Sequence, residues 1–249
     1  MDLAQQPDYG WALPLTGAGQ SDLEQMDVSA APGWQSAVTE RYSFSLLGMS
    51  LSVSSEFRGG FANAKRYAWA TKPHKEISRG YLDYYARRYP GLREVSQLTL
   101  SDDRDANLVK MEERYFLPGP ALFENDLRED FAFGTENYSQ TFPSYQSGPR
   151  QTPLFVGGRA KHAHKVEVYG APIRFRPADP VNIRNAAFDY SYSGRVSRSG
   201  TMTLEWGFET LDRSVSAGAV AGVIHDAKRM EDSTWFTWDL TPSETSAGN

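Results

Sequence analysis

The chain has 249 residues, a net charge of −5 and no cysteine. The acidic balance argues against a nucleic-acid partner, because binding to phosphates favours a basic protein surface. The missing cysteine excludes disulfides, thiol nucleophiles and zinc–cysteine sites, while 40% hydrophobic and 23% charged residues are typical of a folded globular chain.

Residues 1–37 are expected to form a lead-in segment with little regular structure and at most one short strand. The segment mixes proline and glycine with scattered apolar residues such as Trp11 and Leu13. The sequence lacks both the basic start and apolar run of a signal peptide and the run of about 18 apolar residues of a membrane span. We therefore expect no signal peptide and no membrane insertion. Because a lead-in of this kind usually connects two domains, we expect either a region of a longer protein or a complete protein encoded alone.

Residues 38–117 predict a first β-rich unit that also contains a helix. Apolar and polar residues alternate on both sides of Leu47-Gly48, which predicts a hairpin, because side chains alternate across a strand. Tyrosines then recur at helical spacing and predict a helix over 72–89, which a Pro-Gly pair ends. Two further strands are expected at about 94–100 and 108–116.

A proline-rich connector is expected at 118–153, followed by a second β-rich unit at 154–241 and a frayed tail at 242–249. The chain is therefore predicted to be mainly β, of the α+β class. We expect two β-sheet or β-sandwich-like units that meet around the connector, each with one packed helix. In the second unit the expected elements are strands at about 161–169, 183–192, 201–211 and 236–240 and a helix at 215–231.

The predicted tyrosine helix provides the best binding-site candidates, which are Tyr81, Tyr84, Tyr85 and Arg88. Clustered aromatic side chains are able to stack on sugars or peptides, but a helical stripe this regular more often packs against a sheet. A binding module for a glycan or a peptide would need these tyrosines, or Trp206 and Trp238, to form a contiguous exposed patch.

His162 and His164 are weak candidates for a metal site. They are separated by one residue in an expected strand, so both rings point to the same side, and this spacing suits two ligands of zinc or iron. Lys161 and Lys165 flank the pair and would repel a dication, so an exposed polar strand face is the favoured interpretation. The acidic residues that could supply a third ligand are Glu167, Asp189 and Glu205.

No other catalytic constellation is found in the sequence. It contains neither a nucleophile elbow nor a phosphate-binding loop. Adjacent carboxylates such as Glu112 and Glu113 would point to opposite faces of a strand and so would not share one substrate. The chain is therefore expected not to be an enzyme and to use no cofactor.

Several segments of the chain carry a resemblance to a known family. They are PDYGWALPL at 7–15, EFRGGFANAKRYAWA at 56–70, YLDYYARRYPGL at 81–92, and DDRDAN and EERY within 102–115. Together they resemble the C-terminal part of a family of uncharacterised bacterial transglutaminase-like proteins. In that family a β-sandwich domain precedes a papain-like transglutaminase core, and a β-rich region follows the core. The resemblance covers most of residues 7–116 and extends more weakly to about residue 240.

This resemblance implies a non-catalytic accessory or interaction region. The family's proposed Cys/His/Asp triad lies in the preceding core, and neither the cysteine nor a matching motif is present here. The implied partner is a transglutaminase-like core in the same or a neighbouring polypeptide, and the implied location is the bacterial periplasm or cell envelope. The alternatives are a stand-alone β-sandwich binding module for a glycan or peptide and, more weakly, a metal-dependent enzyme that uses His162 and His164.

Overall fold

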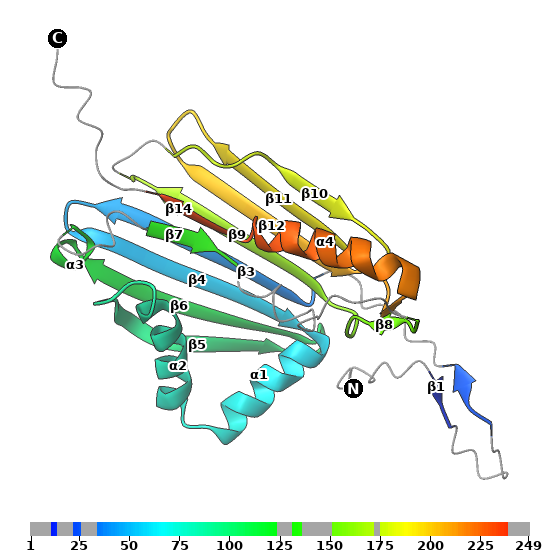
Figure 1. Cartoon of the computed structure of the whole chain (residues 1–249). Helices are drawn as coiled ribbons and strands as arrows, with labels where there is room; N and C mark the ends of the chain where they lie inside the picture. The colour runs from blue at the N-terminus through cyan, green and yellow to red at the C-terminus, as the bar shows by residue number, and fades with distance from the viewer. Residues whose placement is uncertain are drawn as a thin grey trace.

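One eight-stranded β-sheet forms the centre of the computed structural model, which describes residues 11–13, 22–25, 34–123, 131–135, 151–171 and 175–238. Four of its strands come from the first expected unit and four from the second. They are β3 (Ser36–Ser45), β4 (Gly48–Arg58), β5 (Arg93–Asp103), β6 (Leu108–Pro118), β9 (Lys161–Tyr169), β10 (Val181–Arg184), β11 (Phe188–Val196) and β12 (Met202–Thr210). The spatial order is β10-β11-β12-β9-β3-β4-β6-β5 (Figure 1).

The two expected β-rich units share this single sheet, which corrects the prediction of separate sheets or sandwiches. Strands β3 and β9 pair in parallel at the centre, with the register running from Ser36 opposite His162 to Ser43 opposite Tyr169. All other neighbours in the sheet are antiparallel. The pairing of β3 with β9 removes an open strand edge from each of the two units. Open edges are prone to non-specific association. The mainly β, α+β prediction is confirmed.

The predicted hairpin is present, with a two-residue turn at Leu46–Leu47 between β3 and β4. Gly48, the first residue of β4, has φ +136°, a backbone conformation that favours glycine. A Cβ atom at this position would lie 2.1 Å from the backbone oxygen of Leu117, so the close approach of β6 also requires glycine.

Two helices, α1 (Gly59–Thr71) and α2 (His74–Ala86), connect β4 to β5, whereas one helix over 72–89 was predicted. The sequence pattern missed α1 because its apolar face is weak and Ala62 is its buried residue. Another helix, α4 (Val220–Glu231), starts later than the predicted 215, because a short 3-10 helix at Ala217–Ala219 precedes it. Among the described residues, no helix is long and apolar enough to cross a membrane.

Short elements complete the described part of the chain. The expected connector contains α3 (Gly119–Phe123) and strand β7 (Phe131–Gly134), and the lead-in contains two paired strands where at most one was predicted. Most other residues of the lead-in and of the connector, and the whole tail at 242–249, lie outside the described residues. The small strand pairs are β1 (Trp11–Ala12) with β2 (Glu24–Gln25), β8 (Leu154–Phe155) with β13 (Ser214–Val215), and β7 with β14 (Trp235–Trp238).

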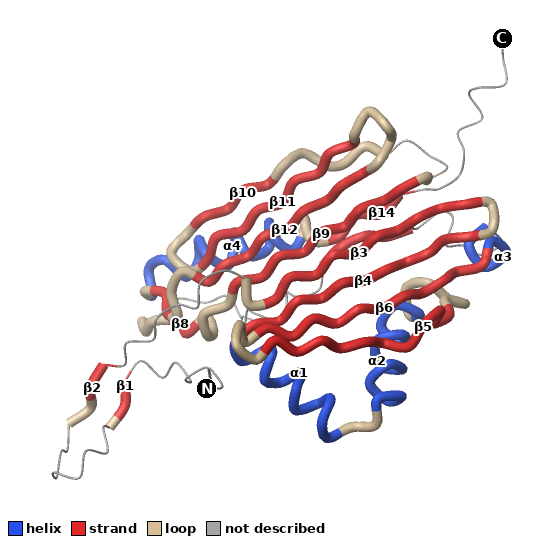
Figure 2. The backbone as a smooth tube through the Cα atoms, turned by 180° about the vertical axis from the view of Figure 1, so that it is seen from behind, coloured by secondary structure: helices blue, strands red, loops and turns tan. Residues whose placement is uncertain are grey.

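The two faces of the large sheet differ in character. Helix α4 and the β7–β14 pair lie on one face (Figure 1), and the view from behind shows the strands in front of them (Figure 2). The covered face buries an aromatic core, in which Tyr42, Phe131 and Phe133 contact one another edge-on or tilted, at centroid distances of 4.8–6.2 Å. The alternation of buried and half-buried residues along β9 and β12 follows from this one-sided cover.

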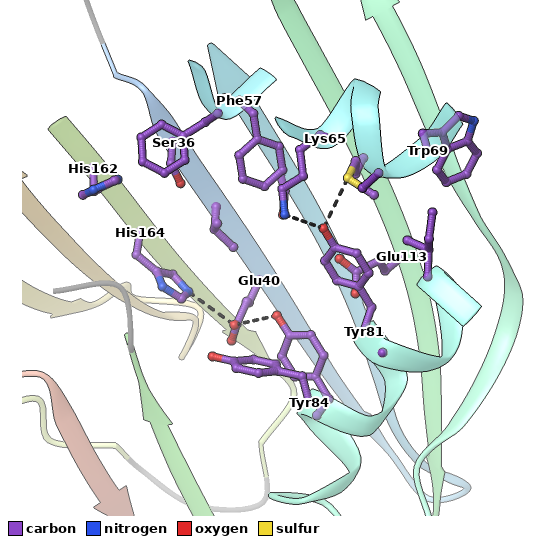
Figure 3. Close-up of a pocket in the computed structure, with 18 of the residues that line it drawn as sticks. Ser36, Glu40, Phe57, Lys65, Trp69, Tyr81, Tyr84, Glu113, His162 and His164 are labelled. Atoms are coloured by element: carbon purple, nitrogen blue, oxygen red, sulfur yellow. Dashed lines mark hydrogen bonds and ion pairs between the residues drawn. The ribbon is translucent and has the colours of Figure 1, made fainter. Parts of the chain in front are cut away.

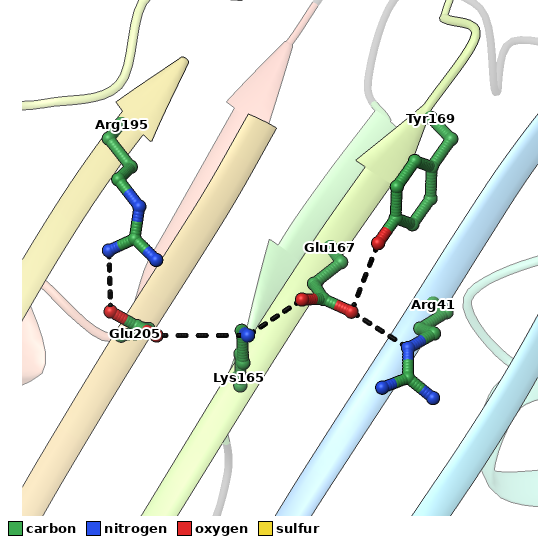
Figure 4. A network of polar contacts seen from close by, with 6 residues as sticks. All are labelled: Arg41, Lys165, Glu167, Tyr169, Arg195 and Glu205. Carbon is green, nitrogen blue, oxygen red and sulfur yellow. Dashed lines mark hydrogen bonds and ion pairs between the residues drawn. The ribbon is translucent and has the colours of Figure 1, made fainter. Parts of the chain in front are cut away.

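The other face carries a network of charged side chains that crosses four strands (Figure 4). Glu167 Oε2 accepts from Arg41 Nε at 2.7 Å, and Glu167 Oε1 lies 2.6 Å from Lys165 Nζ. Arg195 and Glu205 continue the network with a contact of 2.8 Å. The Arg195–Glu205 pair is solvent-exposed, so it contributes little to stability, whereas the Glu167 side chain is half-buried.

Candidate functional site

A cavity of about 1160 Å³ lies between the covered face of the sheet and helices α1 and α2. Strands β3, β4, β6 and β9 supply its floor, the helices supply one wall, and the segment 157–160 borders it as well. Figure 3 shows aromatic side chains around polar groups that rise from the strands. A cavity of this size and lining is typical of sites for small molecules.

Two glutamates lie in one row across the cavity floor. Glu40 on β3 is opposite Val53 on β4, and Val53 is in turn opposite Glu113 on β6. Side chains at paired positions point to the same face of a sheet, so both carboxylates point toward the helices. Their exposed fractions are 1% for Glu40 and 2% for Glu113. Buried carboxylates at this level are rare without partners, so their contacts define the site.

The Glu40 carboxylate is surrounded by hydrogen-bonding groups. Oε2 accepts a bond of 2.6 Å from the Tyr42 hydroxyl, and Oε1 accepts one of 2.9 Å from the Tyr85 hydroxyl. His164 Nε2 lies 3.3 Å from the same Oε1 (Figure 3). Burial opposes the charge on Glu40, but the adjacent imidazole, Arg88 and the Tyr42 hydroxyl outweigh it and lower the carboxyl pKa.

The Glu113 carboxylate has a poorer set of partners. Its Oε2 accepts a hydrogen bond of 2.6 Å from the Tyr115 hydroxyl on the same strand. Burial raises the pKa of Glu113 to about 7, and the Tyr115 hydrogen bond and the charge of Lys65 offset only part of that rise. At neutral pH this group is therefore a carboxylic acid for a large fraction of the time.

Lys65 reaches into the same part of the cavity from α1. Its ammonium donates a hydrogen bond of 2.8 Å to the Tyr81 hydroxyl, which donates to Met111 Sδ at 3.4 Å (Figure 3). The ammonium also lies 4.4 Å from the centroid of the Phe57 ring. Burial lowers the pKa of Lys65, and the negative charge of Glu113 opposes this effect.

Three of the four predicted binding residues border the cavity, namely Tyr81, Tyr84 and Tyr85. Arg88 lies away from it, with its guanidinium 4.3 Å from the centroid of the Trp235 ring. Tyr85 is buried, while Tyr81 and Tyr84 are half-buried. The Tyr84 and Tyr85 rings meet at 88°, so they form a wall of the cavity in place of a flat platform.

The predicted tryptophans do not form an exposed platform either. Trp206 is buried, and its indole donates a hydrogen bond of 2.9 Å to the Ser233 carbonyl oxygen. Trp238 is half-buried and packs against the hydrophobic core. The surface-binding hypothesis requires an exposed aromatic patch, and Trp206 and Trp238 do not form one.

His162 and His164 both border the cavity and are buried, which corrects their prediction as an exposed strand face. Lys161 and Lys165 point to the opposite face of the sheet, where their partners are glutamates. Burial lowers the pKa of His162 to about 4, so its ring is neutral at physiological pH. Among the described residues, no three histidines, aspartates or glutamates are placed to hold a metal ion.

Sequence reasoning missed Glu40, Lys65 and Glu113 as members of one site. A charged residue at a position where the strand pattern demands an apolar one is the signal that marks Glu40 and Glu113. Lys65 lies on the helix that the pattern did not predict, so it had no assigned face.

Comparison of the chain with models of protein families, with curated protein sequences and with solved structures found no significant match. The resemblance to transglutaminase-like proteins therefore stays a prediction from the sequence.

Proposed function

We propose that this chain is a binding module that takes up a small organic ligand, of the size of a short peptide or a disaccharide, in the cavity beneath α1 and α2. The observation that carries the proposal is a cavity of about 1160 Å³ with aromatic walls and two buried carboxylates on its floor. Apolar walls with a few placed polar groups are the usual design of a ligand site, since the walls bind and the polar groups orient. In this role the chain is a non-catalytic receptor for its ligand.

Two glycines, one at the cavity and one away from it, allow a direct test. A Cβ atom at Gly80 on α2 would meet no heavy atom within 4 Å, so Gly80→Phe places a ring at the cavity without forcing a clash at its Cβ. Gly222 on α4 is equally open at its Cβ but does not border the cavity, which makes Gly222→Phe the matched control.

The measurement is the fluorescence titration of the native chain with 8-anilinonaphthalene-1-sulfonate, an aromatic probe for apolar cavities. We expect one saturable site, an affinity at least tenfold weaker in Gly80→Phe, and an unchanged affinity in Gly222→Phe. Circular dichroism of each variant verifies the native fold. No saturable binding, or equal binding by both variants, would contradict the proposal.

A second proposal, supported by the family resemblance, is that the chain is an accessory region that docks on a transglutaminase-like core. The observation that favours a docking role is the turn between β3 and β4, where Leu46 and Leu47 are 100% and 78% exposed. Two adjacent exposed leucines at a hairpin tip form a small apolar surface that a partner would bury on docking.

Affinity purification of the tagged chain from its source cells tests this second role. We expect a polypeptide with a transglutaminase-like core among the recovered proteins, and its loss when Leu46 and Leu47 are both replaced by serine. Recovery of no such polypeptide, or equal recovery by the double variant, would exclude docking through this turn.

A further inference from the structure

Lys65 differs from other lysines of this chain in what its ammonium contacts. Lys110, Lys161 and Lys165 each lie within 2.6–3.0 Å of a glutamate oxygen. The Lys65 ammonium instead donates to the neutral phenol of Tyr81 at 2.8 Å and lies over the Phe57 ring. A phenol and an aromatic ring stabilise an ammonium less than a carboxylate does, so the neutral amine is easier to form at this position.

The position of Lys65 in the fold also favours the neutral amine. Lys65 is half-buried and borders the cavity, so its nitrogen is shielded from bulk water and open to a ligand in the cavity. Burial lowers its pKa, which increases the fraction of neutral amine, the form that is nucleophilic. A lysine in a desolvated pocket is the usual source of an amine nucleophile in proteins.

An acid group borders the same part of the cavity. Glu113 has a pKa of about 7, so near neutral pH it is present both as a proton donor and as a carboxylate. The charges of Lys65 and Glu113 stabilise each other. Burial raises the pKa values of the neighbouring phenols of Tyr81 and Tyr115 well above the usual range, so both stay neutral.

We propose that Lys65 is a reactive amine that captures a small aldehyde or ketone in the cavity as a reversible imine. The inference rests on the proposed ligand-binding role of the cavity and names the chemical class of the ligand. Lys65, Tyr81 and Glu113 hold the three positions that imine formation requires: a nucleophilic amine, a hydroxyl beside it and a proton donor.

The reaction balances without an oxidant, a reductant or any other reactant. The neutral amine of Lys65 attacks the carbonyl carbon, a C–N bond forms, and the oxygen takes up the proton released by nitrogen. Glu113 then gives its proton to the resulting hydroxyl, which leaves as water while the C=N bond forms. The proton lost from nitrogen in this last step returns to Glu113, and the reverse sequence with water releases the carbonyl compound.

Reductive trapping of the native chain tests the proposal. Benzaldehyde and sodium cyanoborohydride at pH 7 convert any imine to a stable secondary amine, and peptide mass spectrometry measures the labelling rate at each lysine. Lys72 borders the same cavity and is exposed, so it is the internal control. We expect Lys65 to be labelled at least tenfold faster than Lys72, and Glu113→Gln to slow Lys65 at least tenfold while Lys72 is unchanged.

Lys65→Arg keeps the positive charge but forms no imine. We expect this variant to lose the fast labelling, and circular dichroism verifies its native fold. Equal labelling rates for Lys65 and Lys72 in the native chain would overturn the imine proposal. If the native chain still binds 8-anilinonaphthalene-1-sulfonate in that case, the ligand-binding role stands without the imine. If the native chain does not bind this probe, the ligand-binding role fails, whatever the labelling result.

Discussion

Two strands of the cavity floor, β3 and β6, present the same residue type in two different electrostatic environments. Glu40 and Glu113 lie in one row of the sheet, face the same helices and are both almost fully buried. Burial alone raises the pKa of a carboxyl group, and this is the largest single effect at both positions. The net pKa shift is nevertheless downward for Glu40 and upward for Glu113.

The hydrogen-bonding and charged partners, and not the depth of burial, decide the direction of the pKa shift at each glutamate. Glu40 accepts from two tyrosine hydroxyls and has an imidazole at 3.3 Å, whereas Glu113 accepts from one tyrosine hydroxyl. A carboxylate with several hydrogen-bonding partners stabilises the fold, whereas a carboxyl group with few partners is available for proton transfer. We therefore assign a structural role to the Glu40 end and reactivity to the Glu113 end.

The largest effect is expected from Glu40→Ala. Its removal leaves the hydroxyls of Tyr42 and Tyr85 without their acceptor and the His164 ring without the carboxylate beside it, all in the protein interior. Loss of one member of such a buried network costs about 3–5 kcal/mol of unfolding free energy. Urea denaturation at pH 7 measures it, and a loss below about 1 kcal/mol would show that the network is not structural.

Glu113→Gln is expected to act in the opposite direction at neutral and higher pH. The pKa of Glu113 is raised from 4.5 to about 7, so the folded chain holds a proton that the unfolded chain releases. Native stability therefore falls as the pH rises from 4.5 to 7, by roughly 3 kcal/mol in all. The variant lacks this decline, so urea denaturation should find it more stable at pH 8 and equal to the native chain near pH 4. Parallel curves would contradict the raised pKa.

His162→Phe provides the acid-side counterpart. The pKa of His162 is lowered from 6.5 to about 4, so the unfolded chain binds a proton that the folded chain does not. This part of the stability is present above pH 6.5 and is lost as the pH falls toward 4. In the native chain this loss of unfolding free energy is expected to be on the order of 2 kcal/mol, because one side of the ring borders the cavity and is only partly desolvated. The variant is expected not to show this loss. Melting temperatures at pH 4.5 and 7 measure it, and an unchanged acid slope would contradict the prediction.

The smallest effect is expected from Glu205→Ala on the open face of the sheet. Its contacts with Arg195 and Lys165 are solvent-exposed ion pairs, at 2.8 and 4.0 Å. Such pairs contribute about 0–1 kcal/mol, and added salt weakens them further. Urea denaturation of this variant sets the baseline for the two buried glutamates, and a loss above about 2 kcal/mol would show that the charged network is structural after all.

Local patterns predicted the secondary structure well where one face of an element is buried. The strand expected at 161–169 coincides with β9, because its alternate residues are buried against the core. The strand expected at 183–192 is in fact β10 and β11, since a turn at 185–187 interrupts the run of apolar residues. Helix α1 was missed because its contact with the sheet leaves only a narrow buried stripe.

The candidate site could be predicted only in part. The spacing of Tyr81, Tyr84 and Tyr85 placed them on one helix face, and the spacing of His162 and His164 placed both rings on one side of a strand. Neither pattern indicated that the two faces border the same cavity, because α2 and β9 are brought together by the sheet between them. The charged residues at apolar positions, Glu40 and Glu113, were the overlooked clue.

By itself the sequence determined the mainly β class, the alternation along the strands and the absence of cysteine chemistry. Those properties depend on neighbours within a few residues, or on composition alone. The tertiary structure decided that two β-rich regions form one sheet and that Lys65, Glu113 and the histidines border one cavity. Such contacts join residues far apart in the chain, as Arg41 and Glu167 are at a separation of 126 residues. Their choice depends on which strand edges and apolar faces cover each other, a property of the whole packed molecule.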